Sequence, residues 1–465
     1  MKRREFLRAV GLAATSLVAS PYTRVAESFA AEAIKGKTNI VIALADDLGY
    51  GDLGCYGHPD IRTPNLDKFA SAGLKLTDCY APSPLCSPAR VGMLTGRTPY
   101  RCGIYDYLRR EDPMHLKKEE VTVATLLKES GYATCHVGKW HCTGKFNSPE
   151  QPQPDEHGFE YWFSTGMDSK PTQQNPENFV RNGKPVGPLE GYSSTLIVRE
   201  AINWLKNRWD RKRPFCLFVW FHAPHEYVRT AAEFMDMYKG RKEAIYYGNV
   251  TQMDYEFGRL MKTMDEMKLR DKTFVMFTSD NGPEGLRRYR KAVNSFGSAG
   301  PLRAGKLSLY EGGIRVPGII RWPGRVKAGS VCREPVNGTD VLPTLCAIAG
   351  VDVPAARPID GANILPIFEG KKLERKVPLY WRYDLASSRP FNVAMRQGDW
   401  KILADNKMTK FRLYNLAEDI AEKHNVAESY PEKTASMKQT LIRLNAEIER
   451  EGPKWDSKWK PPKAK

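Results

Sequence analysis

The strongest constraint on the fold is a set of four short apolar runs, each of which ends directly in polar side chains. They are Asn39–Ala45 before Asp46 and Asp47, Tyr132–Val137 before Lys139 and His141, Phe215–Phe221 before His222 and His225, and Phe274–Ser279 before Asp280 and Asn281. Continuous apolar runs of this length are typical of strands that are buried on both faces. In open α/β sheets the ligand site lies beyond the carboxyl ends of the strands. We therefore expect these polar side chains to share one site.

The segments between these runs have the periodicity of helices. Apolar residues recur at three- and four-residue spacing over 122–129, 196–207 and 249–268, as in amphipathic helices. Proline and glycine cluster over 146–190, which predicts long irregular loops rather than a domain linker. Buried strands alternating with helices predict an α/β fold, in which helices cover a large sheet.

After about residue 375 the pattern changes to short strands joined by turns. These strands are expected at 379–382, 391–396, 400–403 and 411–414. An amphipathic helix is expected at 436–450, so we predict a small α+β C-terminal subdomain with a four-stranded antiparallel sheet. The resulting domain boundaries are 1–30 for a leader, 31–375 for the main domain and 376–465 for the subdomain.

The first 30 residues have the composition of an export signal. Lys2-Arg3-Arg4 makes a basic start, the stretch 9–20 is apolar or small, and Ser28-Phe29-Ala30 forms a cleavage site. The Arg3-Arg4 pair indicates the twin-arginine route. The apolar stretch is shorter than the roughly 20 residues that a membrane span needs. We therefore expect a periplasmic or secreted protein without a membrane span.

The chain is basic, with a formal net charge of +17. Such a charge favours polyanionic partners in general, and a sulfated polysaccharide fits it as well as a nucleic acid does. No nucleic-acid-binding motif accompanies the charge, so we predict no nucleic-acid partner.

One cysteine, Cys86, stands in a distinctive motif. The nine cysteines are too scattered for a disulfide scaffold, and their odd number leaves one that cannot pair within the chain. Cys86 opens the pattern Cys-Ser-Pro-Ala-Arg, in which Pro88 favours the first turn of a helix and Arg90 follows one turn after the cysteine. A helix N-terminus favours an anion, so the sequence predicts a functional cysteine rather than one that only packs under a loop.

Two further groups of residues carry chemistry. The first offers hard oxygen ligands and consists of Asp46, Asp47, Asp280 and Asn281. Carboxylates crowded into one cleft repel one another unless a cation lies between them, and this donor set suits Ca²⁺ or Mg²⁺. The second is cationic or titratable and consists of Arg90, Lys139, His141, His225 and Lys306. His222 is a weaker candidate, which we expect to hold its own loop.

Several of these residues lie in longer motifs that resemble those of a known family. The motifs are DDLGYGDLGCYG (46–57), TPNLDKFASAG (63–73), PLCSPARVGMLTGR (84–97), GYATCHVGKWH (131–141), APH (223–225), SDNG (279–282), GKLSLYEGGIRVP (305–317) and LYNLAEDIAEKHNVA (413–427). They look like those of the type I, formylglycine-dependent sulfatases of the alkaline-phosphatase-like superfamily. The N-terminal half is most similar to the N-acetylgalactosamine-6-sulfatase and arylsulfatase A types. The resemblance implies a large mixed sheet flanked by helices and makes 31–375 a sulfatase catalytic domain.

The resemblance also implies a role for each motif residue. One calcium ion would be held by Asp46, Asp47, Asp280 and Asn281, together with residue 86. Cys86 matches the cysteine that a maturation enzyme oxidises to formylglycine, whose hydrate attacks sulfur. The groups around the sulfate would be Arg90, Lys139, His141, His225 and Lys306. His225, with Lys306, would protonate the departing oxygen, and His141 would help to expel the sulfate. One local departure from the family is Ala304, where a second glycine is common.

The implied activity is release of sulfate from a sulfated sugar or polysaccharide. Six loop residues are expected to recognise the sugar: Tyr105, Asp106, Tyr107, Arg109, Glu226 and Arg287. Two alternatives stay open. One is a phosphomonoester or phosphonate hydrolase of the same superfamily, and the other is a non-catalytic, calcium-dependent binder of sulfated glycans.

Overall fold

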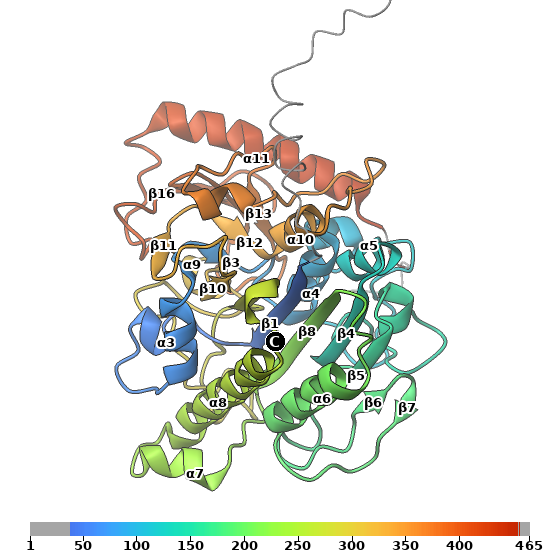
Figure 1. The fold of residues 1–465 in the computed structure, drawn as a ribbon. Helices are drawn as coiled ribbons and strands as arrows, with labels where there is room; N and C mark the ends of the chain where they lie inside the picture. The colour runs from blue at the N-terminus through green and yellow to red at the C-terminus, as the bar shows by residue number, and fades with distance from the viewer. Residues whose placement is uncertain (1–37, 454, 456–465) are drawn as a thin grey trace, which may run out of the picture. The chain divides into compact units, whose positions relative to one another are not determined.

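A ten-stranded mixed sheet forms the centre of the computed structural model, which describes residues 38–453 and 455 (Figure 1). In sheet order the strands are β11 (Ser330–Cys332), β2 (Leu74–Leu76), β10 (Gly318–Arg321), β9 (Thr273–Ser279), β1 (Asn39–Asp46), β8 (Phe215–Pro224), β4 (Ala133–Lys139), β5 (Tyr161–Thr165), β6 (Val180–Arg181) and β7 (Lys184–Pro185). The four predicted strands are the adjacent, parallel β9, β1, β8 and β4. The α/β prediction is therefore confirmed, and the sheet is mixed because β10 and β6 run antiparallel to their neighbours.

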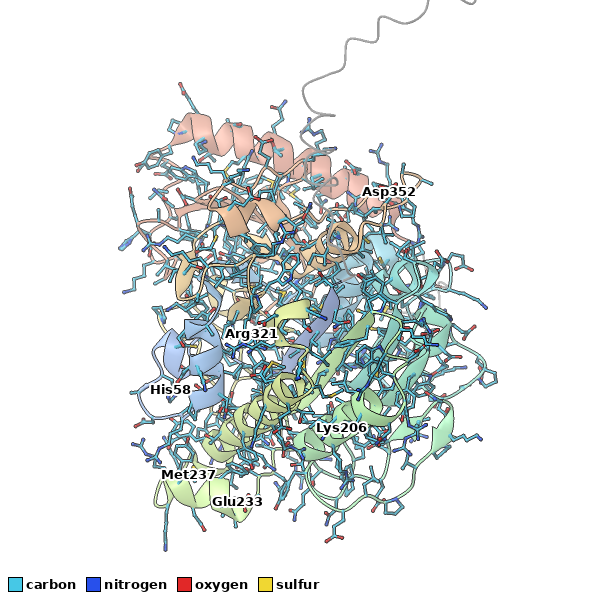
Figure 2. All side chains as sticks on the ribbon, viewed as in Figure 1. His58, Lys206, Glu233, Met237, Arg321 and Asp352 are labelled. Atoms are coloured by element: carbon cyan, nitrogen blue, oxygen red, sulfur yellow. The ribbon has the colours of Figure 1, made fainter. Side chains whose placement is uncertain are left out.

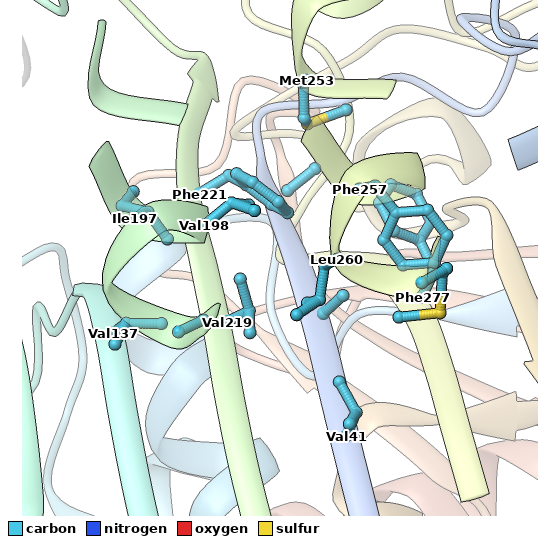
Figure 3. Packing of buried hydrophobic residues seen from close by; sticks show 14 of the residues in the cluster. Val41, Val137, Ile197, Val198, Val219, Phe221, Met253, Phe257, Leu260 and Phe277 are labelled. Atoms are coloured by element: carbon cyan, nitrogen blue, oxygen red, sulfur yellow. The ribbon is translucent and has the colours of Figure 1, made fainter. Parts of the chain in front are cut away.

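Helices cover both faces of this sheet. On one face α6 (Ser193–Asn207) and α8 (Ala244–Glu266) pack on the central strands, where Val198 and Leu260 lie against Val41 and Val219 (Figure 3). Burying a side chain of this size stabilises the fold by roughly 1.5–3 kcal/mol. On the other face α10 (Val341–Ala349) packs against β1 and β9. All eight residues of β1 are buried, which is why the run has no polar alternation.

The predicted helices are confirmed, with earlier starts at three of the four. Thr122 caps α5 (Val123–Glu129), because its Oγ1 accepts a hydrogen bond from the Thr125 N–H at 3.1 Å. α6 and α8 begin three and five residues before the predicted positions. Lys206, near the end of α6, is exposed (Figure 2). The other α-helices of the described residues are α3 (Pro64–Ser71), α4 (Cys86–Thr95), α7 (Ala232–Met235), α9 (Glu311–Ile314) and α11 (Pro431–Glu451).

The prediction of irregular loops over 146–190 is wrong in part. The strands β5, β6 and β7 lie within that range and extend the central sheet. All five residues of β5 are buried, although the strand is short and turn-forming residues flank it on both sides. The proline and glycine content of the flanks therefore concealed a fifth parallel strand.

The predicted C-terminal sheet is confirmed. Its antiparallel strands are β13 (Leu379–Arg382), β14 (Phe391–Gln397), β15 (Trp400–Asp405) and β16 (Phe411–Asn415). α11 covers one face, where Leu441 and Ile448 pack on Val393 and Ile402. Elsewhere β3 (Cys79–Tyr80) pairs in parallel with β12 (Val336–Asn337).

The domain boundaries stay predictions. The export signal expected at 1–30 lies outside the described residues. Among the helices that the structure describes, none is both long and apolar enough to cross a membrane.

A buried ionic cluster joins the C-terminal sheet to the main domain. Lys401 on β15 is fully buried, and its Nζ lies 2.8 Å from Glu311 and 2.9 Å from Glu422. Glu311 also accepts a hydrogen bond from Tyr80 and pairs with Arg315 at 3.2 Å. Glu311 opens α9, five residues after Lys306, so the cluster fixes the segment that carries a predicted site residue.

Substituting Lys401→Met is expected to lower the free energy of unfolding by about 3–5 kcal/mol, because two buried carboxylates lose their shared cation. The measurement is urea unfolding followed by circular dichroism. Lys410→Met, at an exposed position, is the matched control and should change stability by less than about 0.5 kcal/mol. Equal losses in the two variants would contradict a role of this cluster in stability.

Candidate active site

The predicted site residues meet at one edge of the sheet. Asp46 ends β1, Lys139 ends β4, His225 follows β8 and Asp280 follows β9. These strands are parallel neighbours, so their carboxyl ends lie together (Figure 1). Asp47 and His141, just beyond two of the strands, have φ angles of +67° and +54° in the left-handed region. Non-glycine residues adopt this region at a cost and concentrate at functional sites.

Cys86 is the first residue of α4 and Arg90 follows one turn later, as predicted. Cys86 is buried, and burial raises the pKa of its thiol to about 11. At pH 7 only about one thiol in 10⁴ is then ionised. The smaller effects on this pKa come from charged neighbours: Lys139 and Lys306 lower it, and Asp46 and Asp280 raise it.

Arg90 holds the acidic residues in place. Its Nη2 and Nε donate to Asp280 Oδ2 at 2.6 and 3.0 Å, and Nη1 donates to the Lys139 carbonyl at 2.7 Å. Its Nη2 also lies 3.6 Å from Asp46 Oδ1. The guanidinium is fully buried, so it supplies a fixed positive charge to the floor of the site.

Three carboxylates converge as a metal site would require. Oxygen atoms of Asp46, Asp47 and Asp280 lie within 4.8 Å of one another. Asp46 Oδ1 and Asn281 Oδ1 are buried without a hydrogen-bond partner, so both are free to bind a cation. Burial and the neighbouring Asp46 raise the pKa of Asp280 to about 6, which reflects the crowding of negative charge. The clusters of possible metal ligands found among the described residues do not include Cys86. The expected role of residue 86 as a metal ligand therefore stays a prediction.

Two lysines pair with these carboxylates. Lys139 Nζ donates to Asp46 Oδ2 at 2.7 Å, and Lys306 Nζ donates to both oxygens of Asp47 at 2.6 and 2.7 Å. Burial would raise the pKa of Asp46, but Lys139, His225 and Arg90 outweigh it and hold that pKa well below its usual value. Burial would lower the pKa of Lys306, but Asp47 and Glu284 raise it well above the usual value. Both lysines are therefore cationic at neutral pH.

The two predicted histidines differ in their surroundings. His141 Nε2 lies 2.9 Å from the Leu108 carbonyl, which can only accept, so Nε2 carries the proton and the buried, unpartnered Nδ1 does not. Burial and Lys139 lower the pKa of His141 well below its usual value. His225 Nδ1 lies 2.5 Å from the Glu226 carbonyl, and its Nε2 faces Asp47 at 3.6 Å. His222 lies within β8, and its Nε2 contacts Thr165 Oγ1 of β5 at 2.7 Å, so its expected role in holding the following loop stays a prediction.

Two acidic residues of the site were missed by the sequence reasoning. Asp168 lies 3.4 Å from Lys139 Nζ and 3.6 Å from His225 Nδ1. It follows β5, and recognition of that strand would have placed it at the same sheet edge. Glu284 lies 3.8 Å from Lys306 Nζ and also pairs with Arg288. Glu284 comes three residues after Asn281, in the same loop after β9.

The six residues expected to recognise a sugar do not act alike. Glu226 is buried, and its carboxylate accepts hydrogen bonds from the Val228 and Asn294 backbone and from Ser295, so it holds loops together. Tyr105 donates to the Pro453 carbonyl at 2.7 Å. Asp106 is buried and binds Arg109 at 2.9 Å, and Arg109 lies over the ring of Tyr107 at 4.2 Å. Arg287 is exposed. The Glu226 carboxylate is therefore occupied by the loops, and sugar contact by the other five residues stays a prediction.

Comparisons with known proteins find two matching family models and several related sequences. Residues 38–351 match the sulfatase family model, and residues 305–448 match the model described as N-sulphoglucosamine sulphohydrolase, C-terminal. The chain is 34% identical to N-acetylgalactosamine-6-sulfatase of Canis lupus familiaris, covering 74% of this chain and 69% of that protein. It is 33% identical to arylsulfatase A of Homo sapiens, covering 90% of this chain and 89% of that protein.

A solved structure is also similar over nearly the whole chain. The structure of Ps i-CgsB in complex with k-i-k-neocarrahexaose has a TM-score of 0.80 and 29% identity, covering 90% of this chain and 94% of that chain. The family match spans most of the chain, and both curated relatives exceed 30% identity over most of their length. The chain therefore belongs to the sulfatase family of enzymes.

Proposed function

We propose that the protein hydrolyses sulfate esters on the sugars of an extracellular polysaccharide. The observation that carries this proposal is that buried cations and a three-carboxylate cluster meet in one site, and that Lys139, Lys306, Asp46 and Asp280 of this site act electrostatically on Cys86 at the start of α4. Such a site binds a small oxyanion and stabilises negative charge during its transfer. Relatives named N-acetylgalactosamine-6-sulfatase, and a similar structure solved with a neocarrahexaose, support a sugar substrate.

The charge balance of the site supports a bound dication. Five carboxylates lie in contact with four basic side chains: Asp46, Asp47, Asp168, Asp280 and Glu284 with Arg90, Lys139, Lys306 and Arg288. A sulfate ester adds a further negative charge, so the site needs more positive charge than the chain supplies. Asp46, Asp47, Asp280 and Asn281 would hold one Ca²⁺, which would act as a Lewis acid toward the ester oxygens.

Residue 86 would act as an aldehyde rather than as a thiol. Its thiol is protonated at neutral pH, so it is a poor nucleophile as it stands. Formylglycine, made from Cys86 by a maturation enzyme, would supply the attacking oxygen once hydrated. Arg90 follows residue 86 by one turn of α4, and Lys139 and Lys306 are close enough to affect the Cys86 thiol electrostatically, so these three side chains would hold the ester sulfur beside it.

The histidines would then move the protons. His225 is held through Nδ1 by the Glu226 carbonyl, which leaves Nε2 to protonate the departing sugar oxygen, with Lys306 beside it. Asp47 lies 3.6 Å from Nε2 of this ring and Asp168 lies 3.6 Å from Nδ1. His141 would accept a proton at Nδ1 when the sulfate departs, because that nitrogen is unprotonated and has no partner. We further propose export through the twin-arginine route, which fits a polysaccharide substrate outside the cytoplasm.

The test is sulfate release by protein purified from its own host. We expect inorganic sulfate from 4-nitrocatechol sulfate and from sulfated oligosaccharides, and an aldehyde located at position 86 by fragment mass spectrometry of the tryptic peptide Leu76–Arg90. Release of phosphate but not sulfate would favour the phosphohydrolase alternative. Binding of sulfated sugar without release, by protein with a verified aldehyde, would favour the non-catalytic binder.

A further inference from the structure

Two lysines converge on one tyrosine ring. The Nζ of Lys291 lies 5.1 Å from the centroid of the Tyr227 ring, and the Nζ of Lys170 lies 5.7 Å from the same centroid. Both lysines are exposed and the tyrosine is half-buried. Among the described residues, no ion pair joins either lysine to a carboxylate. The ring face attracts each ammonium group, and within the part of the chain that the structure describes neither group has a carboxylate partner.

This lysine pair lies on segments that also supply the active site. Lys170 follows Asp168, which contacts Lys139 and His225. Tyr227 is two residues after His225. Lys291 is three residues after Arg288, which pairs with Glu284, and Glu284 in turn lies 3.8 Å from Lys306.

The segments are fixed relative to one another. The buried Glu226 carboxylate accepts hydrogen bonds from the Asn294 N–H at 2.6 Å and from Ser295 Oγ at 3.2 Å, which ties the loop after β8 to the loop that carries Lys291. Lys170 donates its backbone N–H to Asn178 Oδ1 at 2.8 Å. The loops that carry the two lysines are therefore tied by hydrogen bonds to the segments that follow β5 and β8.

The side chains next to Lys291 in the sequence are also mostly positively charged. The segment 287–291 reads Arg-Arg-Tyr-Arg-Lys, and four of its five side chains are exposed cations. Arg288 pairs with Glu284, whereas no ion pair joins Arg287 or Arg290 to a carboxylate in the part of the chain that the structure describes. An anion placed between Lys170 and Lys291 would therefore meet positive charge from both loops.

We propose that Lys170, Lys291 and Tyr227 form a second anion subsite beside the hydrolytic site. It would take a sulfate or carboxylate group on a sugar next to the one whose ester is hydrolysed, through charge-assisted hydrogen bonds from both ammonium groups. This inference rests on the proposed function and narrows its substrate class. The preferred substrate is then an oligosaccharide with at least two anionic groups rather than a monosulfated sugar.

The test compares a polyanionic sugar with a single anion. Sucrose octasulfate and inorganic sulfate are titrated by calorimetry into wild-type protein and into the double variant Lys170→Gln/Lys291→Gln. Glutamine keeps much of the side-chain stem and removes the charge. We expect the Kd of sucrose octasulfate to rise about tenfold or more relative to the Kd of inorganic sulfate, because only the larger ligand reaches both sites. The variant Lys170→Arg/Lys291→Arg should retain tight binding of the octasulfate.

The matched control removes two charges from the opposite edge of the sheet. Lys206, labelled in Figure 2, and Lys212 are both exposed. They precede the amino end of β8, whereas the site lies at its carboxyl end. Lys206→Gln/Lys212→Gln should leave the ratio of the two Kd values unchanged. An unchanged ratio in the Lys170/Lys291 variant, or an equal change in the control, would overturn the subsite. Hydrolysis of 4-nitrocatechol sulfate by the wild type is measured separately, so failure of the proposed function would be seen independently of these binding results.

Discussion

Substituting Cys86→Ser is expected to abolish sustained turnover of 4-nitrocatechol sulfate, lowering kcat by a factor on the order of 10⁴–10⁶, as loss of a nucleophile does in other hydrolases. A serine hydroxyl can take the sulfuryl group once. It offers no second hydroxyl on the same carbon whose proton His141 could accept, so the sulfate ester would persist. The measurement is the time course of product release at enzyme concentrations high enough to resolve a single turnover. We expect at most one equivalent of product per protein molecule.

The control for this variant is Cys332→Ser, at a half-buried cysteine on β11 at the edge of the sheet. It should retain wild-type kcat, which would show that a cysteine-to-serine change does not by itself remove activity. Mass spectrometry of the Cys86→Ser protein after reaction should show a sulfated serine at position 86. Repeated turnover by the Cys86→Ser protein would refute a reaction that depends on a modified residue 86.

The central sheet was predictable because burial on both faces leaves a simple signal. A strand such as β1, whose eight residues are all buried, has an apolar sequence that no surface element shares. Its polar successors Asp46 and Asp47 then fall at the sheet edge by geometry alone. The same reasoning located Lys139, His225 and Asp280, since each follows a run of this kind.

The parts of the site that sequence reasoning missed depend on contacts between distant segments. Asp168 was hidden because β5 is short and lies among turn-forming residues. Glu284 belongs to the site because it lies close to Lys306 and Arg288 in the fold. The spacing of these residues in the sequence does not indicate that contact. The raised pKa of Cys86 has the same origin, since its largest cause is burial by the rest of the fold. Glu226 shows the reverse error, because a polar loop residue beside the site proved to be buried and fully occupied with other loops.

The second large effect concerns Asp47, whose carboxylate belongs to the proposed calcium site and also accepts hydrogen bonds from Lys306. Substituting Asp47→Asn removes one of the three converging carboxylates and keeps the size of the side chain. Asparagine also tolerates the left-handed backbone at this position, where φ is +67°. We expect kcat/KM for 4-nitrocatechol sulfate to fall by about 10²–10³-fold or more, as for loss of a major electrostatic contributor at an active site.

Calcium binding gives a readout of Asp47 that does not depend on activity. A ligand that binds only the folded state at 100 times its Kd stabilises it by about 2.7 kcal/mol. Added Ca²⁺ should therefore raise the Tm of wild-type protein treated with a chelator, and this increase should be much smaller for Asp47→Asn. Asp352→Asn is the control, because Asp352 is exposed and lies outside the site, and its response to Ca²⁺ should equal that of the wild type (Figure 2). A wild-type response in Asp47→Asn, or no response in the wild type, would contradict a calcium site at these carboxylates.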